Sequence, residues 1–271
     1  MNKKERINQH GWMLIKNLYS PAEIETIREL GLQTQDQKGD VLSNEALKYI
    51  LLDERLINIL KEVLGTDEIV YFGDSSVSIE GKSHGFHKDS RDRFKKEGKE
   101  WHDIDYSIVR IGIYLQDHSK HSGGLCLRDQ SHLNQSVEVG KILNVKSEVG
   151  DLVVWKLTTT HSGNADILAL FPRLSLHPNI ARRIPKMFLQ DRIKPRMVIF
   201  SAFGKDDEFT HEYIEYLKTR TYAIDRWLDS NYEANQVEDF AKLNVKVIEV
   251  DKEELKKIKL SEATNDKFVQ V

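Results

Sequence analysis

An alternation of apolar and polar residues between Ser107 and Asp117 is the feature that most limits how this chain can fold. The apolar positions are Val109, Ile111, Ile113 and Leu115, and the residues between them are Arg110, Gly112, Tyr114 and Gln116. A period of two is typical of a strand with one buried face and one more polar face. A polar turn with two glycines follows at residues 117–124, and residues 125–128 resemble a second strand. We therefore expect a β-sheet in the middle of the chain, with a hairpin across this turn.

Residues before this region are expected to be mainly helical. Ser20-Pro21-Ala22-Glu23 combines an N-cap serine, a proline at the first helical position and a glutamate three residues after the cap. This pattern predicts a helix that begins at Pro21 and stops at Gly31. Apolar residues at helical spacing predict two more helices, over 43–51 and 53–64. Residues 69–72 are then expected to begin a strand.

The chain is expected to form one domain over residues 1–271. At 271 residues it could hold one large domain or two, but β-barrels of this size are routinely single domains. The expected parts are a helical one at 1–66, a sheet core at about 67–204 with an insertion at 165–194, and a second helical one at 205–271. Within the last part, helical spacing covers 211–227 and a short strand is expected over 243–248.

Composition limits the partners and the compartment of the protein. The formal net charge of −3 is too small for bulk attraction to nucleic acid or to an anionic membrane, and acids interrupt the basic residues. Cys126 is the only cysteine, which excludes an internal disulfide and fits a reducing compartment. No apolar segment has the length of a signal peptide core or a membrane span. We therefore expect a cytoplasmic protein that binds neither nucleic acid nor membranes.

Three polar residues are candidate metal ligands. His87 and Asp89 are separated by one residue, so a strand end or a turn can aim both side chains at one ion, and His161 would have to be brought in by folding. Two histidines and one carboxylate can hold a non-haem iron(II) from one side and leave the other side for substrate and oxygen. With 10 histidines and 43 acids in the chain, chance alone gives roughly 1.6 His-x-Asp/Glu matches. The alternative is therefore a surface histidine beside a solvated acid, unless the surrounding sequence supports the metal site.

The surrounding sequence supplies further motifs. In chain order they are Tyr114-Leu115-Gln116-Asp117, Ser122-Gly123-Gly124-Leu125, Ser131-His132, Gly150-Asp151-Leu152-Val153-Val154-Trp155 and His161-Ser162-Gly163-Asn164-Ala165. Together with His87 and Asp89, these motifs resemble the phytanoyl-CoA dioxygenase family of iron(II)- and 2-oxoglutarate-dependent oxygenases. Their order and approximate spacing match the family over roughly residues 70 to 204. The combination is far more specific than any single motif.

The resemblance implies a fold and a set of cofactors. The implied fold is mainly β with flanking helices, a double-stranded β-helix or jelly roll of the cupin type. The implied metal ligands for iron(II) are His87, Asp89 and His161. In the family, an arginine on the strand after the distal histidine binds 2-oxoglutarate, and Arg196 matches it at the start of residues 195–204. A planar guanidinium can bind the far carboxylate of 2-oxoglutarate through two parallel hydrogen bonds.

The resemblance also implies a reaction. Molecular oxygen and 2-oxoglutarate would be consumed to give succinate and carbon dioxide while a small-molecule substrate is hydroxylated. Related halogenases replace the carboxylate ligand by a small residue, so Asp89 favours oxygenation over halogenation. A non-catalytic cupin-like metal-binding or ligand-binding protein is the alternative, because the same barrel serves both. A polar substrate, such as a carbohydrate or a nucleotide-linked intermediate, is favoured by the polar loops after Asp89 and His161.

Two departures from the family pattern are visible. Asp129-Gln130 stands where relatives commonly have Pro-Gly, so this turn is expected to differ. The stretch from His161 to Arg196 is much longer than in many relatives, and the inserted residues 165–194 are rich in arginine and lysine. Long loops inside a compact domain are usually functional, so we expect a lid over the site, with a scaffold or oligomer contact as the alternative. His84 and His102 flank the His87 motif and are further candidates for contact with substrate.

Overall fold

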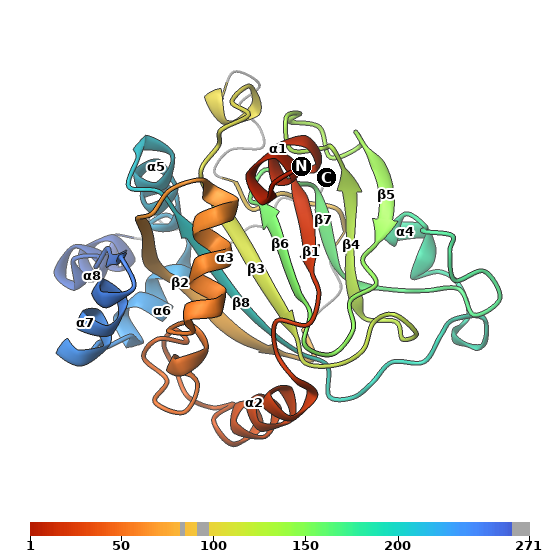
Figure 1. Cartoon of the computed structure of the whole chain (residues 1–271), viewed down its shortest axis with the longest axis horizontal. Helices are drawn as coiled ribbons and strands as arrows, with labels where there is room; N and C mark the ends of the chain where they lie inside the picture. Colours follow the sequence, from red (N-terminus) through yellow and green to blue (C-terminus); the bar gives the residue numbers. More distant parts are fainter. Residues whose placement is uncertain (82–84, 91–97, 262–271) are drawn as a thin grey trace.

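Two β-sheets form the centre of the protein. The structure is a computed structural model that describes residues 1–81, 85–90 and 98–261. The strands are β1 (Trp12–Ile15), β2 (Ile69–Ile79), β3 (Val109–Tyr114), β4 (Gly124–Asp129), β5 (Lys141–Asn144), β6 (Leu152–Lys156), β7 (His161–Ala165), β8 (Met197–Gly204) and β9 (Val245–Val247). The larger sheet has the order β1-β6-β3-β8-β2-β9 and the smaller one β5-β4-β7. All neighbouring strands are antiparallel except β2 and β9 (Figure 1).

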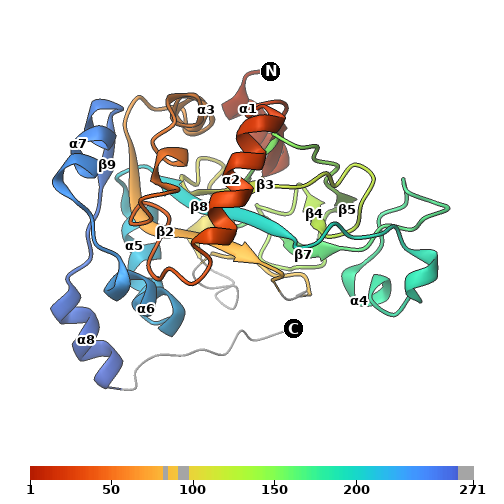
Figure 2. The ribbon, with the colours of Figure 1, turned by 90° about the horizontal axis from the view of Figure 1, so that it is seen from below.

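Helices flank the sheets at both ends of the chain. They are α1 (Lys3–His10), α2 (Pro21–Gln33), α3 (Glu54–Leu64), α4 (Pro178–Ala181), α5 (Glu208–Leu217), α6 (Thr221–Asp229), α7 (Ala234–Lys242) and α8 (Lys252–Leu260), with short 3-10 turns at Lys48–Ile50, Lys99–Trp101 and Lys186–Phe188. In Figures 1 and 2, α2 and α3 cover one face of the larger sheet, while α5 to α8 gather near β2. No helix in the described part of the chain is both long and apolar enough to cross a lipid bilayer.

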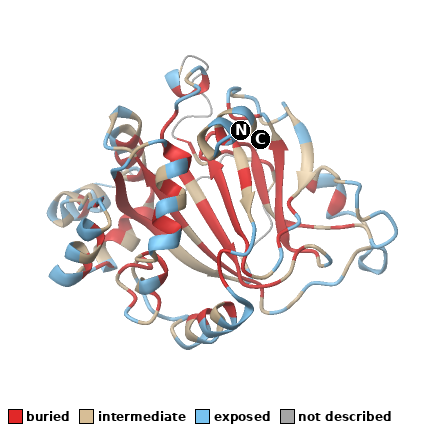
Figure 3. Ribbon diagram, in the orientation of Figure 1, coloured by how far each residue is buried: buried red, intermediate tan, exposed pale blue. Residues whose placement is uncertain are grey.

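The alternation in β3 sorts its side chains between two cores. Val109, Ile111 and Ile113 are buried in the core that the larger sheet shares with α2 and α3. Tyr114 points the other way, into a core between the sheets that also holds Trp155 of β6. Figure 3 shows how continuously the central strands are buried. The polar face of β3 is thereby directed between the sheets, where the candidate site lies.

Two helices were predicted well, α2 from its capping signals and α3 from apolar residues at helical spacing. Ser20 caps α2 with the expected box, and Asp53 caps α3, which ends at Gly65 in the left-handed conformation. The predicted stop of α2 at Gly31 was wrong, because the helix continues to Gln33. Gly31 serves packing instead, since a Cβ there would lie 2.8 Å from Cε of Met197.

Two other sequence-based predictions were wrong. A hairpin does not join β3 to β4, because β6 and β8 occupy both edges of β3 and the turn carries the chain across to the smaller sheet. The helix predicted over 43–51 is reduced to the 3-10 turn Lys48–Ile50. Asn44 accounts for this, because its side-chain oxygen accepts from the Ala46 amide and so competes with helical hydrogen bonding. Strand β1, which pairs with β6, was not foreseen.

Candidate metal centre

His87, Asp89 and His161 come together at one end of the space between the sheets. One potential ligand atom from each lies within 4.8 Å of the other two. Nε2 of His87 is 3.8 Å from Oδ1 of Asp89, and Nε2 of His161 is 3.5 Å from Oδ2. The backbones of His87 and His161 exchange two hydrogen bonds, of 3.0 and 2.9 Å, as an isolated antiparallel bridge. This bridge sets the two imidazoles side by side, with ring centroids 4.4 Å apart.

Backbone carbonyls fix the orientation of both imidazoles. Nδ1 of His87 lies 2.9 Å from the carbonyl oxygen of Gly85, and Nδ1 of His161 lies 3.0 Å from that of Thr159. A carbonyl only accepts, so Nδ1 donates in each ring and Nε2 keeps its lone pair. Metal-binding histidines commonly have this arrangement. The donor set of two imidazoles and one carboxylate therefore fits a divalent transition metal such as iron(II).

The protonation states of Asp89 and His161 at neutral pH also suit metal binding. Burial alone would raise the pKa of Asp89, but the Arg110 guanidinium and the imidazoles of His161 and His87 together outweigh it and hold the pKa at about 2. Nε of Arg110 lies 2.9 Å from Oδ2 of Asp89. Burial lowers the pKa of His161 more than the nearby Asp89 carboxylate raises it. An ionised carboxylate and a neutral imidazole are the forms that coordinate a metal.

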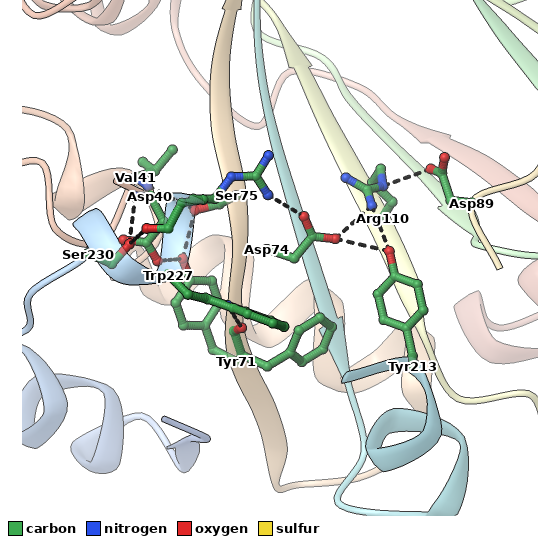
Figure 4. A network of polar contacts seen from close by, with 12 residues as sticks. Asp40, Val41, Tyr71, Asp74, Ser75, Asp89, Arg110, Tyr213, Trp227 and Ser230 are labelled. Carbon is green, nitrogen blue, oxygen red and sulfur yellow. Dashed lines mark hydrogen bonds and ion pairs between the residues drawn. The ribbon is translucent and has the colours of Figure 1, made fainter. Parts of the chain in front are cut away.

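Arg110 also belongs to a buried ion-pair network behind Asp89 (Figure 4). Its Nη2 lies 2.7 Å from Oδ2 of Asp74 on β2, and Nη1 of Arg226 on α6 lies 2.6 Å from Oδ1 of the same carboxylate. The Tyr213 hydroxyl on α5 donates to Asp74 over 3.1 Å. Sequence analysis missed these residues. The inward position of Arg110 in the β3 alternation was the one available signal.

Arg196, the predicted 2-oxoglutarate ligand, lines the same cavity as the three candidate metal ligands. The cavity has a volume of about 220 Å³ and is lined in part by Tyr114, Trp155 and Asn164. Nε of Arg196 donates to the Gly123 carbonyl over 2.6 Å. Gly123 has a φ of +107°, a conformation that favours glycine, so the double-glycine turn presents this carbonyl to Arg196.

The cavity also offers polar atoms to a ligand. The terminal nitrogens of Arg196 lie close to Gly81 and Gly163, where an added Cβ would be 3.7 and 3.8 Å from them. Within the described residues, Trp155 Nε1 and Asn164 Oδ1 are buried without a hydrogen-bond partner. Unsatisfied buried polar atoms are costly unless a ligand or water completes them. Arg196, the three candidate metal ligands and these two polar atoms belong to residues that line one cavity, a combination that suits a small dicarboxylate.

The Ser131-His132 motif ties the end of β4 to the candidate ligand His161. The Ser131 hydroxyl donates to the Arg128 carbonyl over 2.7 Å and accepts from the Thr160 amide over 2.9 Å. Gln130, where relatives commonly have glycine, has a φ of +61°. Its amide donates to the His10 carbonyl, which joins this turn to the N-terminal helix. The turn at Gln130 is therefore left-handed in this chain.

The insertion 165–194 lies beside the cavity, at the edge formed by β4, β5 and β7 (Figure 1). Helix α4 reaches the segment before His87, where the His177 and Phe86 rings make an edge contact at 5.0 Å. The cavity lining includes no residue from 166–194. Of the two flanking histidines, His102 is exposed, and His84 falls outside the described residues.

Comparisons with known proteins give structural matches only. No protein-family model matches the chain, and no curated protein matches its sequence. The non-heme alpha-ketoglutarate-dependent epimerase SnoN from nogalamycin biosynthesis aligns with a TM-score of 0.53 and 12% identity, over 74% of this chain and 79% of SnoN. HygX from Streptomyces hygroscopicus, solved with nickel and 2-oxoglutarate, gives 0.51 and 14%, over 74% of this chain and 85% of HygX.

A third structure, the nickel complex of the non-heme monooxygenase ThoJ, aligns with a TM-score of 0.52 and 14% identity, over 75% of this chain and 77% of ThoJ. Identities this low establish a common fold and no more. Together with the two-sheet topology, they confirm the sequence-based prediction: this chain has the double-stranded β-helix fold of the cupin type, with flanking helices.

Proposed function

We propose that the protein is an iron(II)- and 2-oxoglutarate-dependent dioxygenase of the phytanoyl-CoA dioxygenase type. One observation carries the proposal: His87, Asp89 and His161 converge on one edge of a cavity that Arg196 also lines. The solved structures that share the fold include enzymes described as dependent on alpha-ketoglutarate or solved with 2-oxoglutarate. A cupin-like binding protein would need neither the complete triad nor a buried arginine facing it.

The residues of the chain have distinct tasks in this proposal. His87, Asp89 and His161 hold iron(II) through Nε2, a carboxylate oxygen and Nε2. Arg196, whose side chain is fixed by the Gly123 carbonyl, holds the far carboxylate of 2-oxoglutarate. When bound, iron and 2-oxoglutarate supply an oxidant from molecular oxygen, with release of succinate and carbon dioxide. The apolar walls from Leu125, Trp155 and Phe200 exclude bulk water from this chemistry.

Hydroxylation of a polar small molecule is the outcome that we propose. The carboxylate of Asp89 occupies the position that halide would need, which disfavours halogenation. SnoN is described as an epimerase, so the assay must also detect epimerised product. A cavity of about 220 Å³ is small, so a substrate such as a carbohydrate or a nucleotide-linked molecule would lie largely at its mouth, near the polar residues that precede α4.

Anaerobic titration with iron(II) and then 2-oxoglutarate tests the proposal, followed by a metabolite screen for succinate release in air. We expect the wild-type protein to bind one iron(II) and to bind 2-oxoglutarate more tightly when the metal is present. His87→Ala and His161→Ala should each lose iron binding while circular dichroism shows a folded chain. His102→Ala, which removes an exposed histidine, is the matched control and should bind iron normally.

The possible failures are informative. Binding of metal without succinate release from any candidate substrate, and without slow turnover in the absence of substrate, would favour the cupin-like binding protein. Unfolding of both His87→Ala and His161→Ala would indicate a structural metal site. Absence of metal binding by the wild-type chain would contradict the proposed function itself.

A further inference from the structure

Four charged residues form a line of alternating sign that ends at Asp89. From the C-terminal helices inward, they are Arg226 on α6, Asp74 on β2, Arg110 on β3 and Asp89. The three successive nitrogen–oxygen distances are 2.6, 2.7 and 2.9 Å. Each inner member contacts one charge of opposite sign on either side (Figure 4).

Burial makes every link of this line necessary. The side chain of Asp74 is 3% exposed and that of Arg110 is 15% exposed, so water cannot replace a lost partner. Each of the two carboxylates raises the free energy of the other, and Arg110 contacts both of them. Removing one member of a buried ion pair is strongly unfavourable, because an uncompensated charge stays behind.

Arg110 binds the two carboxylates through different edges of its guanidinium. Nη2 donates a hydrogen bond to Asp74, whereas Nε lies 2.9 Å from Asp89 as an ion pair without hydrogen-bond geometry. The Asp74 carboxylate therefore fixes the orientation of the guanidinium whose charge faces Asp89. The Tyr213 hydroxyl strengthens this link, because it donates to Asp74 and accepts from Nη2 of Arg110 over 3.2 Å. A lysine at position 110 could not span both carboxylates, since an ammonium presents a single point of charge.

We infer that Arg110, held by Asp74, Arg226 and Tyr213, is the positioning residue that fixes the Asp89 carboxylate for metal binding. The inference rests on the proposed metal site and adds residues from β2, β3, α5 and α6 to it. Buried ion pairs seldom stabilise a fold more than apolar residues of similar size would. A line of buried ion pairs that ends on a candidate metal ligand is therefore better explained by a role in positioning that ligand than by a contribution to the stability of the fold.

A second buried carboxylate provides a matched comparison. Asp40 accepts hydrogen bonds from the hydroxyls of Tyr71 and Tyr232 and from the Ser43 amide. In Figure 4 this Asp40 cluster lies on the other side of β2 from Asp74, and no dashed line joins the Asp40 carboxylate directly to Arg110 or Asp89. The Asp40 backbone amide does reach Arg226, because it donates to the Ser230 hydroxyl and that hydroxyl donates to the Arg226 carbonyl. The Asp40 carboxylate itself lies outside the line of alternating charges. The pairs Asp74→Asn and Asp40→Asn, and Tyr213→Phe and Tyr232→Phe, therefore delete the same groups inside and outside that line.

Cobalt(II) is the probe, titrated anaerobically by calorimetry and by its visible absorption, well below the melting temperature of every variant. Asp74→Asn should raise the Kd for cobalt(II) about 10- to 100-fold, as loss of a residue that orients a ligand does. Arg110→Gln should do the same, and Arg110→Lys should recover only part of the loss. Tyr213→Phe, the mildest change, should raise the Kd by about 3- to 10-fold, the effect of one hydrogen bond. The cobalt absorption should shift in each case.

The controls separate positioning from stability. Asp40→Asn and Tyr232→Phe should lower the melting temperature but leave the Kd for cobalt(II) within about 2-fold of wild type, since distant sites act independently. Wild-type affinity and an unchanged spectrum in Tyr213→Phe and Asp74→Asn would overturn the inference, and if Asp74→Asn does not fold, Tyr213→Phe decides alone. Failure of the wild-type chain to bind cobalt(II) would instead count against the proposed function.

Discussion

Arg196 is distinguished at the residue scale by how its side chain is held. One nitrogen is committed to the Gly123 carbonyl, while the guanidinium lies over the Tyr114 ring, 5.7 Å from its centroid. Burial lowers the pKa of Arg196, but an arginine keeps its charge at any physiological pH. The remaining nitrogens are thus charged and oriented before a ligand arrives.

Replacement of Arg196 by lysine tests its proposed role. Arg196→Lys should raise the Kd for 2-oxoglutarate by about 10- to 100-fold, because an ammonium cannot make two parallel hydrogen bonds to a carboxylate. Iron(II) affinity should stay near the wild-type value. Isothermal titration of the metal-loaded protein measures the first quantity, and Arg6→Lys, at an exposed position on α1, is the control. Unchanged 2-oxoglutarate binding in Arg196→Lys would direct attention to Arg183 or Arg192.

The spacing of residues in the sequence predicted part of the candidate site. The rest could not be predicted in this way, for a physical reason. His-x-Asp followed by a distant histidine singled out His87, Asp89 and His161, which the structure brings together. Their role as metal ligands stays a prediction. Asp74 and Arg226 could not be found in this way, because their neighbours in space come from other segments and a buried ion pair has no sequence period.

At the scale of elements, short sequence patterns predicted those helices and strands whose structure depends on neighbouring residues in the chain. The capping box at Ser20 and the alternation in β3 each depend on neighbouring residues, and both were predicted. The pairing of β4 was not, because it depends on which strand edges are free after the whole sheet has assembled. Strand β1 is too short for a recognisable period and exists because β6 offers it an edge.

The insertion 165–194 is the element for which we propose movement. Its exposed apolar side chains lie close together, since the Ala169 amide bonds to the Phe188 carbonyl and so joins the exposed Leu170 and Phe171 to Met187 and Phe188. Such a patch is unusual on a protein surface unless something covers it. Closure over bound substrate, helped by Arg182 and Arg183, would bury part of it and exclude water.

Limited proteolysis distinguishes a lid from a fixed scaffold. With iron(II), 2-oxoglutarate and substrate or a substrate mixture, cleavage within residues 170–192 should slow by about tenfold relative to the ligand-free protein, as expected when the open state becomes rare. Cleavage after residue 242, in the C-terminal helical part, serves as the reference. Equal rates in both states would support a scaffold or an oligomer contact.

At the scale of the whole molecule, we expect the free energy of unfolding to fall in acid because two histidines are buried. Burial lowers the pKa of His118 and of His132 from 6.5 to about 4. Protonation therefore favours the unfolded chain between these values, so stability is complete above pH 6.5 and falls as the pH drops towards 4. Each histidine contributes about 1.4 kcal/mol per pH unit within this window.

Urea denaturation at several pH values measures this loss. His118→Gln should make the decline in the free energy of unfolding shallower by about 1.4 kcal/mol per pH unit between about pH 6 and pH 4.5. The exposed His102→Gln should leave the slope unchanged. A wild-type free energy of unfolding that is flat across this range would contradict the assignment of both histidines as buried and neutral.

The two outer strands of the larger sheet have a consequence for synthesis on the ribosome. Strand β1 at one edge comes from residues 12–15, and β9 at the other comes from residues 245–247. Strand β1 pairs with β6, so the nascent chain must keep its first strand available until residues 152–156 are translated, and Arg226 emerges long after His87. A ribosome that has reached β8 has translated all three candidate ligands but not α6, so the line of charges behind Asp89 is complete only after residues 221–229 have followed.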